Sequence, residues 1–321
     1  MTENLTGKPV KKINRTGLLY RVKRALRRDW QLIVLALPAL AFIIIFAYVP
    51  MYGAQIAFKK YNAVLGIWGS PWVGLDHFRK FFDSYQFASV LKNTLAVSFY
   101  SLIAGFPLPI LLALALNCCR RPKLAKTVQM VTYAPYFISV VVLVGIVMQV
   151  LSPKFGIVNN VIKMFGGEEI LFMATPEYFR SIYVWSGVWQ ATGWNAVIYI
   201  SALSAVDPTL HEAAIVDGAS RLKRVIHIDL PSLVPTIVIM LILSAGQVMN
   251  VGQEKVLLLQ NDMNQKFSEV ISTYIYKVSL QNAMPDFSYG TAIGLFNSAI
   301  NLFLIAVVNG ISKKMSGTGL F

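Results

Sequence analysis

DPTLHEAAIVDGASRLKRVIHIDLP, residues 207–231, is a polar and basic stretch with a long apolar segment on either side. Asp207 predicts a helix N-cap, and Pro208 follows at the first helical position, where a proline loses no hydrogen bond. Gly218 is typical of the left-handed residue that closes such a helix. A second short helix is predicted to follow and to end at Pro231. Isolated helices of this length are marginal in water, so we expect the pair to be stabilised by another surface.

The order Glu-Ala-Ala, three residues, Gly, nine residues and Ile-Asp-Leu-Pro resembles the EAA signature of ABC importer permeases. In that family the signature is a cytoplasmic loop that docks into a cleft of the ATPase subunit. Val225 departs from the pattern, because many members carry an aromatic residue there. An ordinary amphipathic loop and a helix-turn-helix are the alternatives. The resemblance implies an ATPase-coupling role for Glu212, Ala213, Ala214, Asp217, Gly218, Ala219, Ile228, Leu230 and Pro231.

The composition indicates a membrane protein. The 321 residues are 56% hydrophobic and only 14% charged, whereas about a quarter of the residues in soluble domains are charged. Cys118 and Cys119 are adjacent and predict free thiols rather than a disulfide framework. The three histidines are scattered without metal-ligand spacing. We therefore expect this chain to bind no metal and no cofactor.

Six apolar stretches are long enough to cross a hydrocarbon core of about 30 Å, which takes about 20 helical residues. Each is predicted to be a helix, because a spanning segment must satisfy its own backbone hydrogen bonds. The predicted fold class is all-α, a polytopic membrane bundle of six transmembrane helices. Pro107 and Pro109 are expected to kink the second span, and Pro135 the third. The predicted spans are residues 32–50, 93–117, 128–151, 181–206, 233–250 and 290–311.

Basic residues are distributed unevenly between the connections. With the N-terminus inside, the inner segments hold 18 Lys and Arg against 6 acidic residues, and the outer segments hold 11 against 9. The positive-inside rule then places both termini and the 207–231 stretch in the cytoplasm. Attraction of this side to anionic lipid accounts for the net charge of +14 without nucleic acid. We expect a multi-pass protein of the bacterial plasma membrane, with a basic tail (1–30, including a surface helix near 17–28) and one transmembrane domain (31–321).

Two outer connections are long. The first, residues 51–92, is rich in aromatic side chains, which are typical of a membrane interface, and is predicted to hold a surface helix around 75–84. The second, residues 251–289, is predicted to fold back toward a transport path as a gate.

No catalytic constellation is visible in the sequence. It contains no GxxxxGK[ST] phosphate-binding loop and no Gly-x-Ser-x-Gly elbow. The six predicted spans contain no Lys or Arg and no acid pair, whereas an ion-coupled transporter usually carries ionisable groups there. A secondary transporter and a membrane enzyme are thus disfavoured. We expect the chain not to be an enzyme and its energy to come from a partner.

Neutral polar and aromatic side chains are the candidates for a sugar path. Sugars present hydroxyl edges and apolar C–H faces, which suit amides and aromatic rings. The alternative is hydrogen bonding between helices, a common role of Asn and Gln within membranes. The candidates are Trp185, Trp189, Gln190, Trp194, Asn195, Gln247, Asn250, Asn297 and Asn301.

From about residue 28 to 321, the chain resembles the permeases of carbohydrate ABC importers of the maltose-importer type. Pro38, Ala134-Pro135, the 271–276 segment ISTYIY and the 291–294 segment TAIG carry this resemblance. It implies the type I importer fold and a heterodimer with a second, homologous permease. It also implies two copies of an ATPase that hold ATP and Mg²⁺, an external sugar-binding protein, often a lipoprotein, and an oligosaccharide substrate. An importer of another small polar solute, such as a peptide or a polyol, is the alternative.

Overall fold

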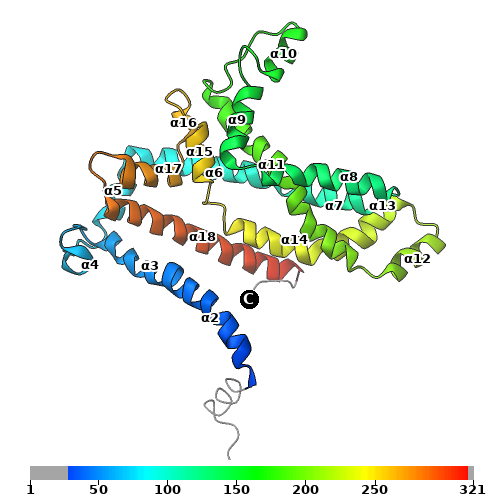
Figure 1. Cartoon of the computed structure of the whole chain (residues 1–321), viewed down its shortest axis with the longest axis horizontal. Helices are drawn as coiled ribbons and strands as arrows, with labels where there is room; N and C mark the ends of the chain where they lie inside the picture. Colours follow the sequence, from blue (N-terminus) through cyan, green and yellow to red (C-terminus); the bar gives the residue numbers. More distant parts are fainter. Residues whose placement is uncertain (1–27, 317–321) are drawn as a thin grey trace, which may run out of the picture. The chain divides into compact units, whose positions relative to one another are not determined.

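The computed structural model describes the backbone of residues 28–316 and the side chains of residues 28–314. The predicted surface helix near 17–28 and almost all of the predicted 1–30 tail lie outside the described residues. The chain divides into two compact units, Met1–Gln55 and Ile56–Phe321, and each is described by itself. Regular structure in the described residues is helical (Figure 1), with one antiparallel bridge between Lys59 and Trp72.

The first unit contains a long apolar helix. α2 (Trp30–Ile43) continues through a π-helical turn at Ile44–Tyr48 into α3 (Val49–Met51). This path contains the predicted first span. Pro38 lies inside α2 without ending it, and no side chain of α2 is buried.

Four helices of the described chain are long and apolar enough to cross a membrane, and a bent helix pair raises the number to five. The helices are Trp30–Phe58, Tyr85–Asn117, Arg221–Ala245 and Phe287–Lys314. α11 (Phe179–Ser204), which contains most of the predicted fourth span, has 26 residues. Its length suffices, but its Trp, Gln, Asn and Ser side chains make it less apolar than the others. Six spans are therefore not confirmed by length and composition.

The predicted third span, 128–151, is wrong as a single helix. α8 (Pro122–Tyr133) ends in a 3₁₀ turn at Ala134–Phe137, and α9 (Val140–Val150) starts anew. The two arms are bent by 104°. The break is stabilised locally, because Ser139 caps α9 by accepting from the Val142 amide at 3.4 Å. Pro135 thus lies at the bend, as predicted, but the bend is far larger than a proline kink.

The predicted second span is interrupted where its prolines begin. α6 (Tyr85–Gly105) and α7 (Pro107–Asn117) are separated by Phe106, directly before Pro107, which has no amide hydrogen to donate. The two helices still form one apolar path of 33 residues.

α11 lies at the centre of the second unit and packs against α6, α7, α8 and α14 (Leu230–Ala245). α14 in turn runs beside α18 (Phe287–Ser316), as Figure 1 shows. Buried apolar residues form three clusters. One joins α5 (Asp76–Phe82) and α6 to α18. The second joins α6, α9 and α11 to α15 (Gln253–Leu259), and the third joins α7, α11 and α14.

Short helices lie in the connections. The predicted surface helix at 75–84 exists as α5, but its Phe81 is only 1% exposed, so this helix packs on α18 as well as facing outward. α5 and the remaining short helices are placed between the long helices. They are α4 (Gly66–Gly69), α5 (Asp76–Phe82), α10 (Ile157–Met164), α12 (Pro208–Val216), α13 (Arg221–Arg224), α15 (Gln253–Leu259), α16 (Gln265–Ser268) and α17 (Ile271–Tyr276).

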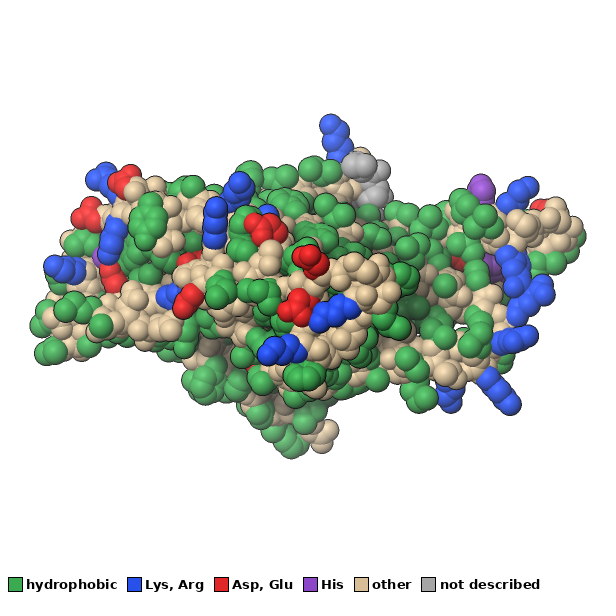
Figure 2. Space-filling view, turned by 90° about the horizontal axis from the view of Figure 1, so that it is seen from above, with side chains coloured by type: hydrophobic (Ala, Val, Ile, Leu, Met, Phe, Trp, Pro, Cys, Tyr) green, Lys and Arg blue, Asp and Glu red, His purple; other side chains and the backbone are tan. Residues whose placement is uncertain are grey.

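Lys and Arg side chains gather at the end of the second unit that carries α12 and α13, on the right in Figure 2. The α7–α8 connection, the start of α8 and the α13 segment hold seven of them between residues 118 and 231. The opposite end shows acidic and basic side chains mixed.

Candidate functional site

The two-helix loop begins as the sequence predicts. The Asp207 side chain accepts a hydrogen bond from the Thr209 amide at 2.9 Å and caps α12. This bond lowers the pKa of the Asp207 carboxyl, so the cap stays ionised at neutral pH. Gly218 has φ +75°, and the Ala219 amide donates to the Ala214 carbonyl at 2.8 Å. Both predicted ends of α12 are confirmed.

The second helix of the loop does not end at Pro231, contrary to the prediction. Ser220 caps α13, and the chain passes through a π-helical turn at Val225–Asp229 directly into α14. The wide turn accommodates a proline that would clash in a regular helix interior. Ser232 Oγ, in the first turn of α14, donates to the Ile228 carbonyl of the π-helical turn at 2.7 Å. Residues Arg221–Ala245 therefore form one helix of 25 residues.

The loop presents apolar side chains to its surroundings. α12 has no buried residue, and Leu210, Ile215 and Val216 are 51%, 56% and 87% exposed. Of the nine residues predicted to couple to an ATPase, six are exposed and three are half-buried. The exposed ones are Glu212, Ala213, Asp217, Gly218, Leu230 and Pro231; Ala214, Ala219 and Ile228 are half-buried. An uncovered apolar helix of this kind is typical of a docking surface.

Asp229 joins the loop to the bundle, and sequence reasoning gave it no role. Its carboxylate is 2% exposed. Oδ1 accepts from Asn117 Nδ2 at 3.2 Å and lies 3.2 Å from His211 Nε2. The Asp229 carboxylate thus connects three elements: the C-terminal end of α7, helix α12 and the π-helical turn. The signal was present in the sequence as an acid inside an otherwise apolar Ile-x-Leu-Pro run.

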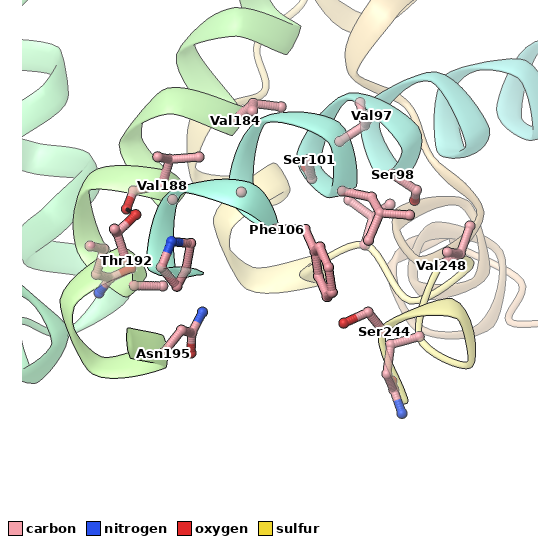
Figure 3. Close-up of a pocket in the computed structure, with 18 of the residues that line it drawn as sticks. Val97, Ser98, Ser101, Phe106, Val184, Val188, Thr192, Asn195, Ser244 and Val248 are labelled. Carbon is pink, nitrogen blue, oxygen red and sulfur yellow. Dashed lines mark hydrogen bonds between the residues drawn. The ribbon is translucent and has the colours of Figure 1, made fainter. Parts of the chain in front are cut away.

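A cavity of about 630 Å³ lies between α6, α7, α11, α14 and α15. Figure 3 shows Phe106 from the α6–α7 junction, Asn195 from α11 and Ser244 from α14 around the same space. Its polar lining combines hydroxyl and amide groups with apolar walls. The polar lining residues are Ser98, Ser101, Tyr183, Gln190, Thr192, Asn195, Tyr199, Ser244, Gln247, Asn250 and Lys255.

Four of the nine predicted path residues line this cavity: Gln190, Asn195, Gln247 and Asn250. Gln190 has a second role, because its Nε2 donates to the Ile138 carbonyl at 2.8 Å and satisfies the broken α8–α9 backbone. Whether the four contact a substrate stays a prediction.

The predicted tryptophans lie away from the cavity lining. Trp185 donates from Nε1 to the Tyr100 hydroxyl at 2.9 Å and ties α11 to α6. Trp194 stacks on Tyr136 with ring centroids 4.7 Å apart. Trp189 is 51% exposed. Hydrogen bonding to α6 describes Trp185, and ring stacking describes Trp194, better than a sugar platform does.

Asn297 and Asn301 of α18 contact Asn250 rather than the cavity. Both donate from Nδ2 to Asn250 Oδ1 at 3.1 Å, and Asn250 donates to Gln247 Oε1 at 2.8 Å. Asn301 Oδ1 also accepts from the Met249 amide at 3.0 Å. Asn297 and Asn301 therefore have the alternative role, hydrogen bonding between helices. Their network holds the cavity-lining amides of Gln247 and Asn250 in place.

Lys255 is a cavity residue that the sequence did not reveal, because it lies in a segment predicted to be external. Lys255 of α15 and Val251, just before α15, both line the cavity, so the 251–289 segment returns to the cavity at these two residues. Its role as a gate stays a prediction. Lys255 is 9% exposed, and burial lowers its pKa to about 8. Its Nζ donates to the Tyr183 carbonyl at 2.8 Å.

Known proteins share this architecture. Residues 105–317 match the family described as binding-protein-dependent transport system inner membrane component. The polygalacturonan/rhamnogalacturonan transport system permease protein YteP of Bacillus subtilis (strain 168) is 42% identical over 290 residues, 90% of either chain. Protein LplB of the same strain is 39% identical over 297 residues, which cover 92% of this chain and 93% of LplB.

Two crystal structures are similar over nearly the whole chain. One is a bacterial ABC transporter involved in the import of the acidic polysaccharide alginate. Its chain is 39% identical with a TM-score of 0.84, covering 92% of this chain and 99% of that one. The other is a bacterial alginate ABC transporter in complex with an alginate pentasaccharide-bound periplasmic protein. Its chain is also 39% identical with a TM-score of 0.84, and the match covers 94% of this chain and 100% of that one. The protein described here belongs to the family of binding-protein-dependent transport system inner membrane components.

Proposed function

We propose that this chain is a permease subunit of an ATP-driven ABC importer that moves oligosaccharides delivered by an external binding protein. The observation that carries the proposal is the uncovered apolar α12 at the basic end of the molecule, on a loop with the family's spacing. The permease relative named for polygalacturonan and rhamnogalacturonan, and the alginate transporter with its periplasmic protein, support a sugar as cargo.

The mechanism follows from one continuous helix. Arg221–Ala245 begins in the loop and ends beside the cavity, where Met240, Leu243 and Ser244 line the wall. Twenty-five helical residues span roughly 37 Å. A partner that docks on α12 and moves on ATP binding displaces this helix through the Asp229 junction, and the cavity wall moves with it. Alternating access of the cavity to the two sides of the membrane results.

The cavity suits a neutral polar cargo over most of its wall. Hydroxyls of Ser98, Ser101 and Ser244 and amides of Asn195 and Gln247 can exchange hydrogen bonds with sugar hydroxyls. Val184, Val188 and Phe106 offer apolar contact to the C–H faces. Such a lining replaces water without requiring an ion.

The remaining expectations are part of the same proposal. α11 is the sixth span, because its 26 residues suffice in length and it packs at the centre of the bundle rather than toward lipid. Residues 31–321 then form one type I permease domain in the bacterial plasma membrane, with both termini cytoplasmic. A second, homologous permease completes the path, and two ATPase copies bind ATP and Mg²⁺.

Co-expression with a homologous permease and an ABC ATPase of the same organism tests the docking. The ATPase is expected to co-purify with the wild-type chain, and reconstituted complexes are expected to import oligosaccharide when ATP is inside. Glu212→Ala at the exposed loop is expected to lower uptake per ATP hydrolysed by at least about tenfold, a loss of about 1.4 kcal/mol of coupling. The matched control is Glu168→Ala, an exposed glutamate outside the loop. Full coupling in Glu212→Ala, or an ATPase that never associates, would contradict the proposal.

A further inference from the structure

Lys255 is the only charged side chain among the described residues that line the cavity. α15 holds it there through two apolar anchors, Val256 and Leu259, which are 0% and 1% exposed. The Nζ atom reaches α11, where it donates to the Tyr183 carbonyl and lies 4.7 Å from the centroid of the Tyr183 ring. A Cβ placed on Gly187, another lining residue, would lie 3.1 Å from Nζ. The amine is therefore built into the cavity wall.

The ammonium group has no anionic partner in the described part of the chain. The ion pairs found there involve other residues, and no Asp or Glu lines the cavity. A lysine ammonium carries three donors, and the Tyr183 carbonyl uses one. Burying an ammonium without a counter-charge is unfavourable, so such groups in proteins are paired or bind an anion.

The groups around the Lys255 amine indicate which class of anion it would bind. A phosphate monoester carries a charge near −2 at neutral pH, which a single ammonium does not balance. A carboxylate carries one charge and accepts hydrogen bonds at two oxygens. The adjacent lining hydroxyls and amides suit the sugar hydroxyls that accompany a carboxylate on a pyranose ring. With a pKa of about 8, the amine is mostly protonated at neutral pH.

We propose that the cavity recognises a sugar that bears a carboxylate, a uronate, and that Lys255 determines this specificity by contacting the carboxylate. The inference rests on the proposed function and adds the chemical class of its cargo. Gly187 contributes by leaving room, since a Cβ there would lie 3.1 Å from Nζ and the amine would have to shift by a few tenths of an ångström.

Binding to the assembled complex tests the inference. Complexes of the full chain with its partner permease and ATPase, in nanodiscs, are titrated with labelled trigalacturonate and with its fully methyl-esterified form. Wild-type complexes are expected to bind the acid at least about tenfold more tightly, because only the acid forms a hydrogen-bonded charge pair with the ammonium. Lys255→Met is expected to lose this preference while binding the ester within about twofold of the wild type.

Two further variants serve as controls. Lys255→Arg keeps the charge and is expected to retain a preference for the acid. Lys154→Met removes an exposed lysine outside the cavity and is expected to behave as the wild type. ATPase association is measured for every variant, so that loss of assembly is distinguished from loss of binding.

The outcomes separate the two proposals. Equal or tighter binding of the ester by the wild type overturns the inference, as does an equal loss of both ligands in Lys255→Met complexes that still assemble. In either case an importer of neutral sugars remains supported if maltotriose binds. If none of the three sugars binds and none stimulates ATP hydrolysis in the presence of the binding protein, the proposed function itself fails.

Discussion

At the scale of single residues, one buried charge lies at each of the two candidate functional regions. Asp229, 2% exposed, is held by Asn117 and His211 where the loop joins the bundle. Lys255, 9% exposed, lies in the cavity wall. Buried charges are costly unless they are partnered. Asp229 has its partners within the chain, whereas Lys255 is left for a ligand.

Cys118 reports on the charge of Asp229. Burial raises the pKa of the Cys118 thiol, and the negative charge of Asp229 raises it further, while Arg224 acts in the opposite direction. A raised pKa means less thiolate at a given pH, and the thiolate is the reactive form. In a Cys119→Ser background, N-ethylmaleimide at pH 8 is therefore expected to label Cys118 more slowly than a free cysteine. Asp229→Asn is expected to speed the labelling, because it removes the charge; an unchanged rate would contradict the link.

Lys255 predicts a pH dependence with a definite sign. Its pKa is lowered to about 8 by burial, so the amine is charged below that pH and neutral above it, whereas an ordinary lysine stays charged to about pH 10. The facing titratable group is Tyr183, whose ring and carbonyl contact Nζ. Binding of trigalacturonate is expected to weaken between pH 7 and 9. The methyl ester and the Lys255→Arg variant are expected to show no such loss, because neither depends on the lysine charge.

At the scale of elements, the turn between α12 and α13 and the helix that follows it form the proposed coupling device. Gly218 at φ +75° lets α12 fold back toward Ser220, which caps α13. The helix then runs without interruption past Pro231 to the cavity. The orientation of α12 is therefore set by one glycine and one carboxylate.

Substitution of Gly218 separates backbone from side-chain effects. A Cβ there would meet no atom within 4 Å, so any effect arises from the positive φ. Gly218→Val is expected to strain the turn by about 1–2 kcal/mol and to lower uptake per ATP hydrolysed. Gly218→Asn, which tolerates this backbone conformation, is expected to retain most of the coupling. Equal behaviour of the two variants in reconstituted transport would show that the turn geometry is unimportant.

At the scale of the whole molecule, the sequence predicts what local chemistry determines. The N-cap at Asp207, the closing Gly218 and the positions of most apolar helices are local, and the structure has them. The α8–α9 break depends on Gln190, which satisfies the Ile138 carbonyl from 52 residues away. The place of Lys255 depends on α15 packing against α11. Pro135 and the Ser139 cap mark the break locally, but the contacts made by Gln190 and by α15 come from distant segments. The predicted continuous span and the predicted uncharged path therefore missed these features.

The continuity of the Arg221–Ala245 helix has one more consequence. The helix is unbroken from the loop through the π-helical turn at Val225–Asp229 to Ser244, so the end that carries the loop is joined directly to the chamber wall. In the proposed importer, each nucleotide cycle must disturb the chamber, even when no cargo is present. Futile ATP hydrolysis can then be prevented only before the helix moves. The ATPase must not close until a substrate-loaded binding protein has docked.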